Sequence, residues 1–550
     1  MSFFQKISRR QAIRDVINEA DHSKGLRKVL GVTDLVAFGI SSTLGSGIFV
    51  SVGLISQFAG PAIFLSFAIA AIGCLLSASC YAEFASMVPV SGQSYTYTYV
   101  ALGEVVAFIT GWLGFLAYSV AAAAVSRGWA AHVSSLIESV WGVTLPNGLV
   151  NCPIEDVSML SVSGLAVFLN LACTVLGCLG VTHSTRLASL LVVVNVSIMA
   201  GFSIYGAASY GEASNLVPLL PSGLGGVLKG SGLAFFCLTG WELTCTLSEE
   251  VRNPSRDLPR GILTALLSVT ILYCSVCLTL SSMVPNENIS VSAPIVDAFR
   301  FHNDEKGAFL VSLTVIIVCI PSTISGIVGT PRIIYKMAKD GLLFPFLAKV
   351  NRYGSPVAAT MLCGLFSASL AGFVSFESLA ASCSAATLFM FAVVCIGLVV
   401  VRVRENESPV DPGLTNGLIL SLLAFIITSF AFCLCLSAGN SESVSIFLLG
   451  VVNILSFCIC IRFYRSATRV TFDPTLALVH RMIMDGKFDK PDRFRCPFVP
   501  YLPLVAAWVN IMIVASLGPA ANVGLILMLL SGLAMYLLYG IRHSKLSQVL

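Results

Sequence analysis

The sequence predicts an all-α integral membrane protein, and three observations lead to this prediction. Of the 550 residues, 56% are hydrophobic and only 11% are charged, which is too little charge to cover a soluble domain. The apolar residues come in long blocks, such as 187–205 and 262–283, of about the length that spans a bilayer. Backbone groups in lipid must be satisfied within their own segment, so these blocks are expected to be helices.

The hydrophobic blocks divide the chain into about fourteen membrane spans. Their predicted centres run from Ile40 to Leu529, with Leu238 at the centre of the sixth and the block 158–180 as the fourth. With the N-terminus inside, 28 of the 32 Lys and Arg residues fall in inner segments, as in cytoplasmic loops. We therefore expect both termini in the cytoplasm. No cleavable signal peptide is expected, because residues 1–28 lack an apolar core.

The composition and motifs argue against several other classes of protein. The net charge of +4 is small and spread along the chain, so no nucleic-acid partner is expected. The sequence has no His-Glu-x-x-His, Gly-x-Ser-x-Gly or P-loop motif, which argues against an enzyme. Most of the 18 cysteines lie in apolar blocks, where cysteine packs as a small hydrophobe. We expect no metal and no other cofactor.

Glycine clusters interrupt two spans near the expected midplane of the bilayer. The first span contains Gly39, Gly45 and Gly47 among hydroxyl side chains, and the sixth holds two glycines within residues 231–242. Such segments are poor helix formers, and unwound backbone at that depth survives only where it lines a cavity. A second interruption five spans after the first is typical of an inverted-repeat transporter. Close helix packing through small residues is the alternative interpretation.

Interrupted helices also indicate what such a cavity could bind. Free amides at the start of a half helix attract a carboxylate, and free carbonyls at the end of one attract an ammonium group. A cavity between two breaks therefore suits an α-amino acid without any charged side chain. A small-molecule amino acid is the expected partner, and the lipid bilayer surrounds the protein.

Three ionisable residues lie within or at the edge of predicted spans, where they are costly and mark functional positions. Glu242 follows the break in the sixth span, and it either meets a substrate cation or caps a half helix. Glu83 lies near the inner end of the second span, where we expect it to organise a gate or an ion pair. Arg127 either faces the pathway or extends outward to the interface.

A glycosylation motif at Asn288-Ile-Ser290 falls in a predicted outer loop. The asparagine is accessible to glycosylation in that orientation, and an unused motif is the alternative.

Several short strings together resemble the cationic amino acid transporter family of the amino acid–polyamine–organocation superfamily. The similarity runs from about residue 31 to 404 and continues more weakly before the thirteenth span. The strings that carry it are TLGSGIF at 43–49, AGPAI at 59–63, CYAEF at 80–84, FITGW at 108–112, EEVRNP at 249–254, PRIIYKMAKDGLLF at 331–344 and FRCPFVPYLP at 494–503.

The resemblance implies a leucine-transporter-type fold, in which spans one to five and six to ten form a 5+5 inverted repeat with four additional helices. It implies a cytoplasmic N-terminal segment (1–31), a transport core (32–404), accessory helices (405–541) with a cytoplasmic loop (462–499), and a cytoplasmic tail (542–550).

The resemblance also implies roles for individual residues. Transport or gating falls to Glu83. In the first span, the residues that would offer amides to the substrate carboxylate are Thr43, Gly45, Ser46 and Gly47. In the sixth span, those that would offer carbonyls to the amino group are Phe236, Cys237 and Thr239. The side-chain pocket would contain Trp241 and Glu242.

Two departures from the family bear on substrate and coupling. The family has Gly-Phe-Asp in the sixth span where this chain has Gly240-Trp241-Glu242, which reshapes the side-chain pocket. Proton-coupled relatives carry a lysine where this chain has Asn195, and an amide cannot cycle a proton. We therefore expect sodium-independent facilitated uniport or exchange by alternating access.

Cationic amino acids such as arginine, lysine and ornithine are the predicted substrates. Neutral amino acids or polyamines on the same fold are the alternative, followed by a sensor that binds amino acids without transporting them. A channel is disfavoured because the interruptions occur in two non-adjacent spans and not in a repeated pore loop. The plasma membrane is the expected location, with a vacuolar or lysosomal membrane as the alternative, and nothing in the sequence indicates an oligomeric state.

Overall fold

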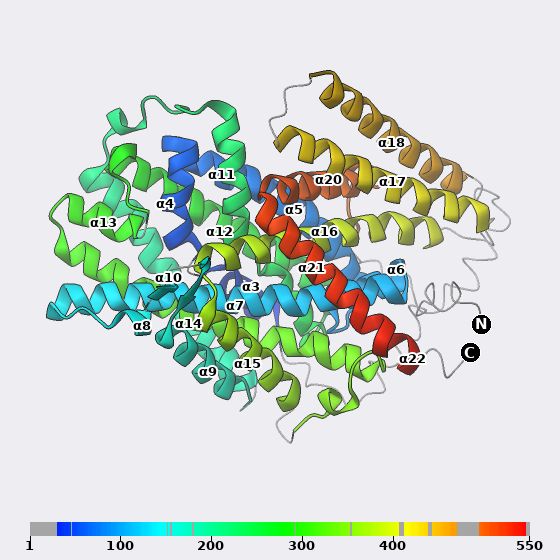
Figure 1. The fold of residues 1–550 in the computed structure, drawn as a ribbon, viewed down its shortest axis with the longest axis horizontal. Helices are drawn as coiled ribbons and strands as arrows, with labels where there is room; N and C mark the ends of the chain where they lie inside the picture. Colours follow the sequence, from blue (N-terminus) through cyan, green and yellow to red (C-terminus); the bar gives the residue numbers. More distant parts are fainter. Residues whose placement is uncertain are drawn as a thin grey trace.

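The protein is described by a computed structural model in which helices make up nearly all of the ordered elements (Figure 1). The only sheet among the described residues is a two-stranded hairpin. The structure describes residues 30–45, 47–150, 152–154, 157–178, 181–291, 293–351, 355–405, 412–437, 443–469 and 494–545.

The first part of the chain forms the helices that contain both glycine clusters. In chain order these elements are α3 (Val32–Thr43), α4 (Gly47–Ala59), α5 (Ile63–Met87), α6 (Gln93–Ala101), α7 (Glu104–Trp141), α8 (Asn147–Val150), β1 (Cys152–Ile154), β2 (Val157–Val162), α9 (Gly164–Cys178), α10 (Val181–Tyr210), α11 (Gly223–Cys237) and the 3₁₀ helix η3 (Trp241–Glu250).

The second part adds the helices that surround this group and the C-terminal end. These elements are α12 (Pro254–Met283), α13 (Pro294–Phe301), α14 (Glu305–Lys339), α15 (Val357–Phe373), α16 (Phe376–Glu405), α17 (Pro412–Ser437), α18 (Ser443–Arg469), α20 (Tyr501–Ser516), α21 (Pro519–Met535), the π-helical turn η6 (Tyr536–Gly540) and α22 (Ile541–His543), with short 3₁₀ turns between some of them.

Local sequence signals account for several of these boundaries. Helix α12 begins at Pro254, whose fixed φ suits the first helical position. Helix α7 ends before Gly142, which adopts a left-handed conformation with φ +65°. Asp304 caps α14 by accepting a hydrogen bond of 2.9 Å from the Gly307 amide, and this bond lowers the pKa of the Asp304 carboxyl from its ordinary value.

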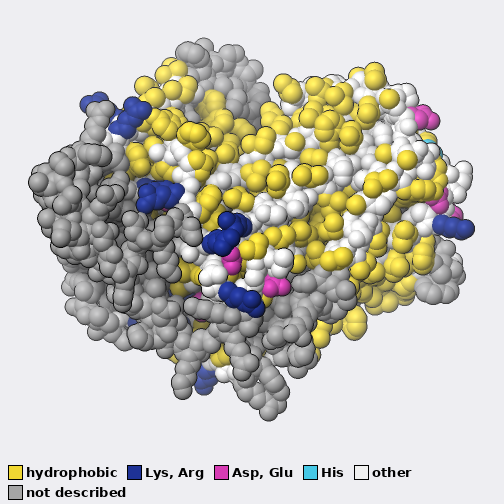
Figure 2. Space-filling model, turned by 180° about the vertical axis from the view of Figure 1, so that it is seen from behind, with side chains coloured by type: hydrophobic (Ala, Val, Ile, Leu, Met, Phe, Trp, Pro, Cys, Tyr) yellow, Lys and Arg dark blue, Asp and Glu magenta, His cyan; other side chains and the backbone are white. Residues whose placement is uncertain are grey.

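The lengths and surfaces of the helices fit a membrane protein. Among the described residues, nine helical stretches are long and apolar enough to cross a bilayer, and four shorter apolar helices accompany them. Large hydrophobic side chains face outward, with Ile204 72% exposed and Leu420 70% exposed. Figure 2 shows a broad hydrophobic surface on the back face, with a few charged side chains near the middle and left of the view and at its right edge. The described residues are nearly all helical, as predicted, apart from the hairpin, while the count of fourteen spans, the inverted repeat and the cytoplasmic termini stay predictions.

One predicted span begins differently from the sequence expectation. The block 158–180 was predicted to be helical throughout, but residues Val157–Val162 form strand β2, antiparallel to β1, and helix α9 starts only at Gly164. Arg127 of α7 contacts this strand. Its guanidinium donates to the Ser161 hydroxyl at 2.6 Å and to the Ser161 carbonyl. Hydropathy alone could not separate this apolar strand from the helix that follows it.

The helix bundle has two ends, which we name after the orientation that the charge count predicts. At one end, Glu83 pairs with Arg402, Leu30 forms an isolated bridge with Val251, and the C-terminal residues reach the start of α7. At the other end, Tyr210 donates to Asp304 and Arg127 donates to the Ala371 carbonyl. We call these the predicted cytoplasmic end and the predicted outer end.

Candidate functional site

The first glycine cluster coincides with an interruption between two helices. Helix α3 ends at Thr43 and α4 begins at Gly47, and the Thr43 hydroxyl donates back to the Gly39 carbonyl at 2.8 Å. A Cβ atom added to Gly45 would lie 2.9 Å from Ser322 Oγ, and one added to Gly47 would lie 3.2 Å from the Cα of Cys237. A larger residue at either position would therefore crowd the neighbouring helices α14 and α11, which approach the break closely.

The second cluster forms a matching interruption between α11 and η3. Helix α11 ends at Cys237, and the chain turns at Gly240, which has φ +113°, before η3 starts at Trp241. A side chain at Gly240 would collide with the Ser42 carbonyl of the first break. The two breaks therefore lie directly against each other.

A small cavity of about 50 Å³ lies at the two breaks, and residues of α7, α14 and α16 also line it. None of the residues that line it carries a charged side chain. The lining residues are Ser42, Thr43, Gly45, Gly47, Tyr118, Ala121, Ala122, Val125, Phe236, Cys237, Thr239, Gly240, Leu243, Ser322, Gly326, Cys383 and Thr387.

Six of the predicted substrate-binding residues line this cavity: Thr43, Gly45, Gly47, Phe236, Cys237 and Thr239. Ser46 lies outside the described residues. The Phe236 carbonyl already accepts the Thr239 hydroxyl at 2.8 Å and its amide at 3.4 Å, so it is less available to a ligand than a carbonyl with no local donor.

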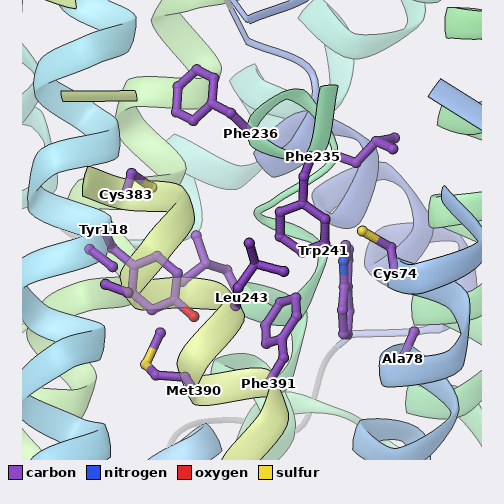
Figure 3. Close-up of a cluster of buried hydrophobic side chains, with 14 of the residues drawn as sticks. Cys74, Ala78, Tyr118, Phe235, Phe236, Trp241, Leu243, Cys383, Met390 and Phe391 are labelled. Carbon is purple, nitrogen blue, oxygen red and sulfur yellow. The ribbon is translucent and has the colours of Figure 1, made fainter. Parts of the chain in front are cut away.

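Trp241 is not among the lining residues of the cavity. Its indole is fully buried and packs against Tyr81 and Phe391, with ring centroids 5.4 Å and 5.1 Å away. Figure 3 shows the indole between Phe391 and the side of α5 that carries Cys74 and Ala78. In this structure the tryptophan therefore packs η3 against neighbouring helices instead of facing the cavity.

Glu242 shows the capping role, one of the two alternatives for its sequence position. The carboxyl group is fully buried, and its Oε2 accepts the Gly240 amide at 2.9 Å, so it caps the turn. Its Oε1 has no hydrogen-bond partner among the described residues, although the Tyr118 phenol lies near the carboxyl. Glu242 itself does not line the cavity. Its neighbours Tyr118 and Leu243 do, so the carboxyl group lies close behind the cavity wall.

Glu83 forms the ion pair that its position suggests. Its carboxylate is 1% exposed and pairs with Arg402 of α16, with Oε1 2.7 Å from Nε and Oε2 accepting from Nη2 at 3.0 Å. Oε2 also accepts the Cys496 amide at 2.7 Å. The residue thus fastens α5 to α16 and to the segment before α20 at the predicted cytoplasmic end.

The remaining predicted residues lie away from the cavity. Asn195 of α10 is 1% exposed, and its Oδ1 has no hydrogen-bond partner in the described part of the chain. Arg127 is 5% exposed and binds carbonyl groups at the predicted outer end, so it neither faces the cavity nor extends into solvent. Asn288 is exposed, as glycosylation requires.

Sequence reasoning missed the residues that α7, α14 and α16 contribute to the cavity. Tyr118, Ser322, Cys383 and Thr387 are the polar residues among them. A signal was present for Ser322, which stands in the polar and glycine-containing stretch 321–331 of an apolar span, whereas Cys383 and Thr387 share their only signal, a polar side chain in an apolar segment, with many other positions.

A helical membrane protein with two interrupted spans around an uncharged cavity is built as a secondary transporter. Comparison with known proteins agrees: the family model described as amino acid permease matches residues 30–455, and that for the C-terminus of the permease matches residues 494–544. The chain belongs to the amino acid permease family and is a transporter, not an enzyme.

Three relatives match between 78% and 98% of this chain. A cationic amino acid transporter 4, vacuolar, of Arabidopsis thaliana is 30% identical over 570 residues, which cover 96% of this chain and 94% of that protein. The branched-chain amino acid permease BcaP of Bacillus subtilis is 29% identical, covering 98% and 99%. A methylthioribose transporter of the same bacterium is 32% identical, covering 78% and 95%. The resemblance to cationic amino acid transporters is confirmed, while the names of the relatives span three kinds of substrate.

Proposed function

We propose that this protein moves amino acids across a membrane by alternating access, as a sodium-independent uniporter or exchanger, with arginine, lysine and ornithine as its first substrates. The observation that carries the proposal is the pair of helix breaks that face one cavity. The N-terminus of α4, beginning at Gly47, offers amides to the substrate carboxylate. The carbonyls of Cys237 and Thr239, at the end of α11, suit the amino group.

The choice of cationic substrates rests on Glu242. It is the acidic side chain beside the second break, and one of its oxygens is free of hydrogen bonds among the described residues. A buried carboxylate without a cation is unfavourable, so a substrate guanidinium or ammonium group would stabilise it. A movement of the Tyr118 ring would bring the substrate cation and Glu242 into contact.

Neutral amino acids are the second candidate, and the uncharged lining of the cavity favours them. The apolar lining residues Leu243, Val125 and Phe236 suit an apolar substrate side chain. A branched-chain amino acid, the substrate class in the name of one relative, has such a side chain.

Asn195 supports transport without proton coupling, because an amide does not titrate in the physiological range.

We propose that the five spans from α3 to α10 and the five from α11 to α16 form inverted repeats, followed by four accessory helices. Both termini are then cytoplasmic and the plasma membrane is the proposed location, with the vacuolar or lysosomal membrane as the alternative.

Flux into proteoliposomes tests the proposal. Purified protein should take up radiolabelled arginine, and lysine and ornithine should compete for it more strongly than leucine or putrescine. Stronger competition by leucine would favour the neutral substrate class. Saturable binding without uptake or exchange would contradict transport and leave the sensor interpretation.

A further inference from the structure

Residues Tyr536 and Ser544, near the C-terminus, both bind the buried side chain of Glu104. Glu104, the first residue of α7, is fully buried, and no Lys or Arg of the described chain is ion-paired with it. Its Oε1 accepts the Tyr536 phenol at 2.9 Å, while its Oε2 accepts the Tyr99 phenol at 2.9 Å and the Ser544 hydroxyl at 2.6 Å. Three hydroxyl donors from α6, η6 and the C-terminal residues thus replace the water that this charge would otherwise need.

The same C-terminal segment also touches the end of α14. The Lys545 amide donates to the Asp340 carbonyl at 3.1 Å, and the Tyr539 ring lies 4.7 Å from that of Phe344. A Cβ atom at Gly341 would collide with the His543 carbonyl, so the two backbones are in close contact. The Asp340 carboxylate in turn accepts the Tyr95 phenol of α6 at 2.7 Å. Tyr95 and Tyr99 of α6 are therefore held by residues that also hold the C-terminal segment.

Helix α6 connects this docking site to the cavity. Gln93, its first residue, has φ +50° and donates from Nε2 to the Tyr118 phenol at 2.9 Å. The ring of Tyr118 lines the cavity. Just before α6, the Ser91 amide donates to Glu249 of η3 at 3.1 Å. A change in the position of α6 would therefore reach both the cavity wall and η3.

The contact region between α6 and η3 is buried but incompletely hydrogen-bonded. Two polar atoms beside this contact have no hydrogen-bond partner among the described residues, namely Ser91 Oγ, whose backbone amide bonds Glu249, and Tyr97 Oη, which lies close to Cys245. Buried polar groups without partners favour separation and hydration of the surfaces that hold them. This contact region is therefore a weak boundary that needs support from outside.

We propose that the segment Tyr536–Lys545, docked on Glu104, is a clamp that holds α6 against η3 and keeps the predicted cytoplasmic end of the cavity closed. Loss of its hydroxyl contacts releases α6, so the contact region opens and takes up water. This proposal depends on the proposed function in one respect: the closed end is taken to be the exit of a transporter. Glu104 acts through α6 and is a positioning residue.

Thiol accessibility tests the clamp without any transport assay. Cys245 of η3 is fully buried and lies close to Tyr97 of α6, so its reaction with a membrane-impermeant maleimide reports opening of the contact region. The reagent is applied to the full chain in membrane vesicles that expose the predicted cytoplasmic end, and labelling of the Cys245 peptide is followed by mass spectrometry. Tyr536→Phe and Ser544→Ala should each raise the labelling rate several-fold, and Ser544→Asp, which sets a second negative charge beside Glu104, should raise it most.

Tyr210→Phe is the matched control, because it removes a phenol-to-carboxylate hydrogen bond of 3.2 Å to Asp304 at the opposite end. Its labelling rate should equal that of the unmodified protein. Rates unchanged in folded Tyr536→Phe and Ser544→Ala, or raised equally in Tyr210→Phe, would overturn the clamp. Because labelling needs no substrate, raised rates in a protein that does not transport arginine would support the clamp and reject only the proposed substrate.

Discussion

Glu242 divides its two carboxylate oxygens between two environments. One oxygen caps the turn at Gly240, and the other has no hydrogen-bond partner among the described residues and lies near the phenol of Tyr118. If Glu242 only caps the turn, its replacement should lower the transport of all substrates alike. If it is a counter-charge for the substrate, its replacement should lower the transport of cationic substrates most. The difference between substrates therefore separates the two roles.

Glu242→Gln should lower kcat/KM for arginine about tenfold to a hundredfold more than for leucine, because a hydrogen bond to a charged group is worth about 1.5–3 kcal/mol. Uptake of both amino acids into proteoliposomes measures this ratio. Glu104→Gln is a control, since that carboxylate lies outside the cavity lining and should not change the ratio. Equal losses for both substrates in Glu242→Gln would leave only the capping role.

Glu83 offers a second prediction at the level of a single residue. Glu83→Gln leaves Arg402, only 16% exposed, without its ionic partner and should destabilise the protein by about 3–5 kcal/mol. The thermal unfolding temperature in detergent checks this. Asp297→Asn breaks an ion pair that is about one-third exposed on each side and should cost less than about 1 kcal/mol. Similar unfolding temperatures for the two variants would show that the Glu83 pair contributes little.

At the scale of elements, the interruption of α3 and α4 depends on the space available at Gly45. Gly45→Ala should abolish most transport, because the new Cβ would lie 2.9 Å from Ser322 Oγ. Adding Ser322→Ala removes that oxygen and should restore part of the flux. Gly201→Ala is the control, since its Cβ meets nothing within 4 Å. Failure of the second substitution to restore any flux would mean that the clash with Ser322 is not the cause of the loss.

Element positions follow from the sequence much better than the cavity does. Long apolar blocks mark the spans, and the glycine clusters mark both interruptions because helix propensity is a local property. The rotation of each helix about its axis is set by packing, so the sequence did not reveal that Tyr118 and Thr387 face the cavity or that Trp241 turns toward Phe391. The hairpin of β1 and β2 was missed because an apolar strand before a helix has the same hydropathy as a longer helix.

At the scale of the whole molecule, the proposed mechanism has an electrical consequence. A uniporter of a monovalent cation equilibrates with the membrane potential, at about 2.3 kcal/mol per 100 mV, so arginine should accumulate about fiftyfold at 100 mV, negative inside. Proteoliposomes with an imposed potassium diffusion potential measure this, and leucine serves as the uncharged control. A pH gradient at zero potential should drive no accumulation. Accumulation under that gradient would contradict the role assigned to Asn195.

The contact between Gly240 and the Ser42 carbonyl has a consequence for how the molecule changes shape. Because no room for even a methyl group separates the two interrupted helices at this point, we expect them to shift together, as one packed pair, when the cavity opens to either side.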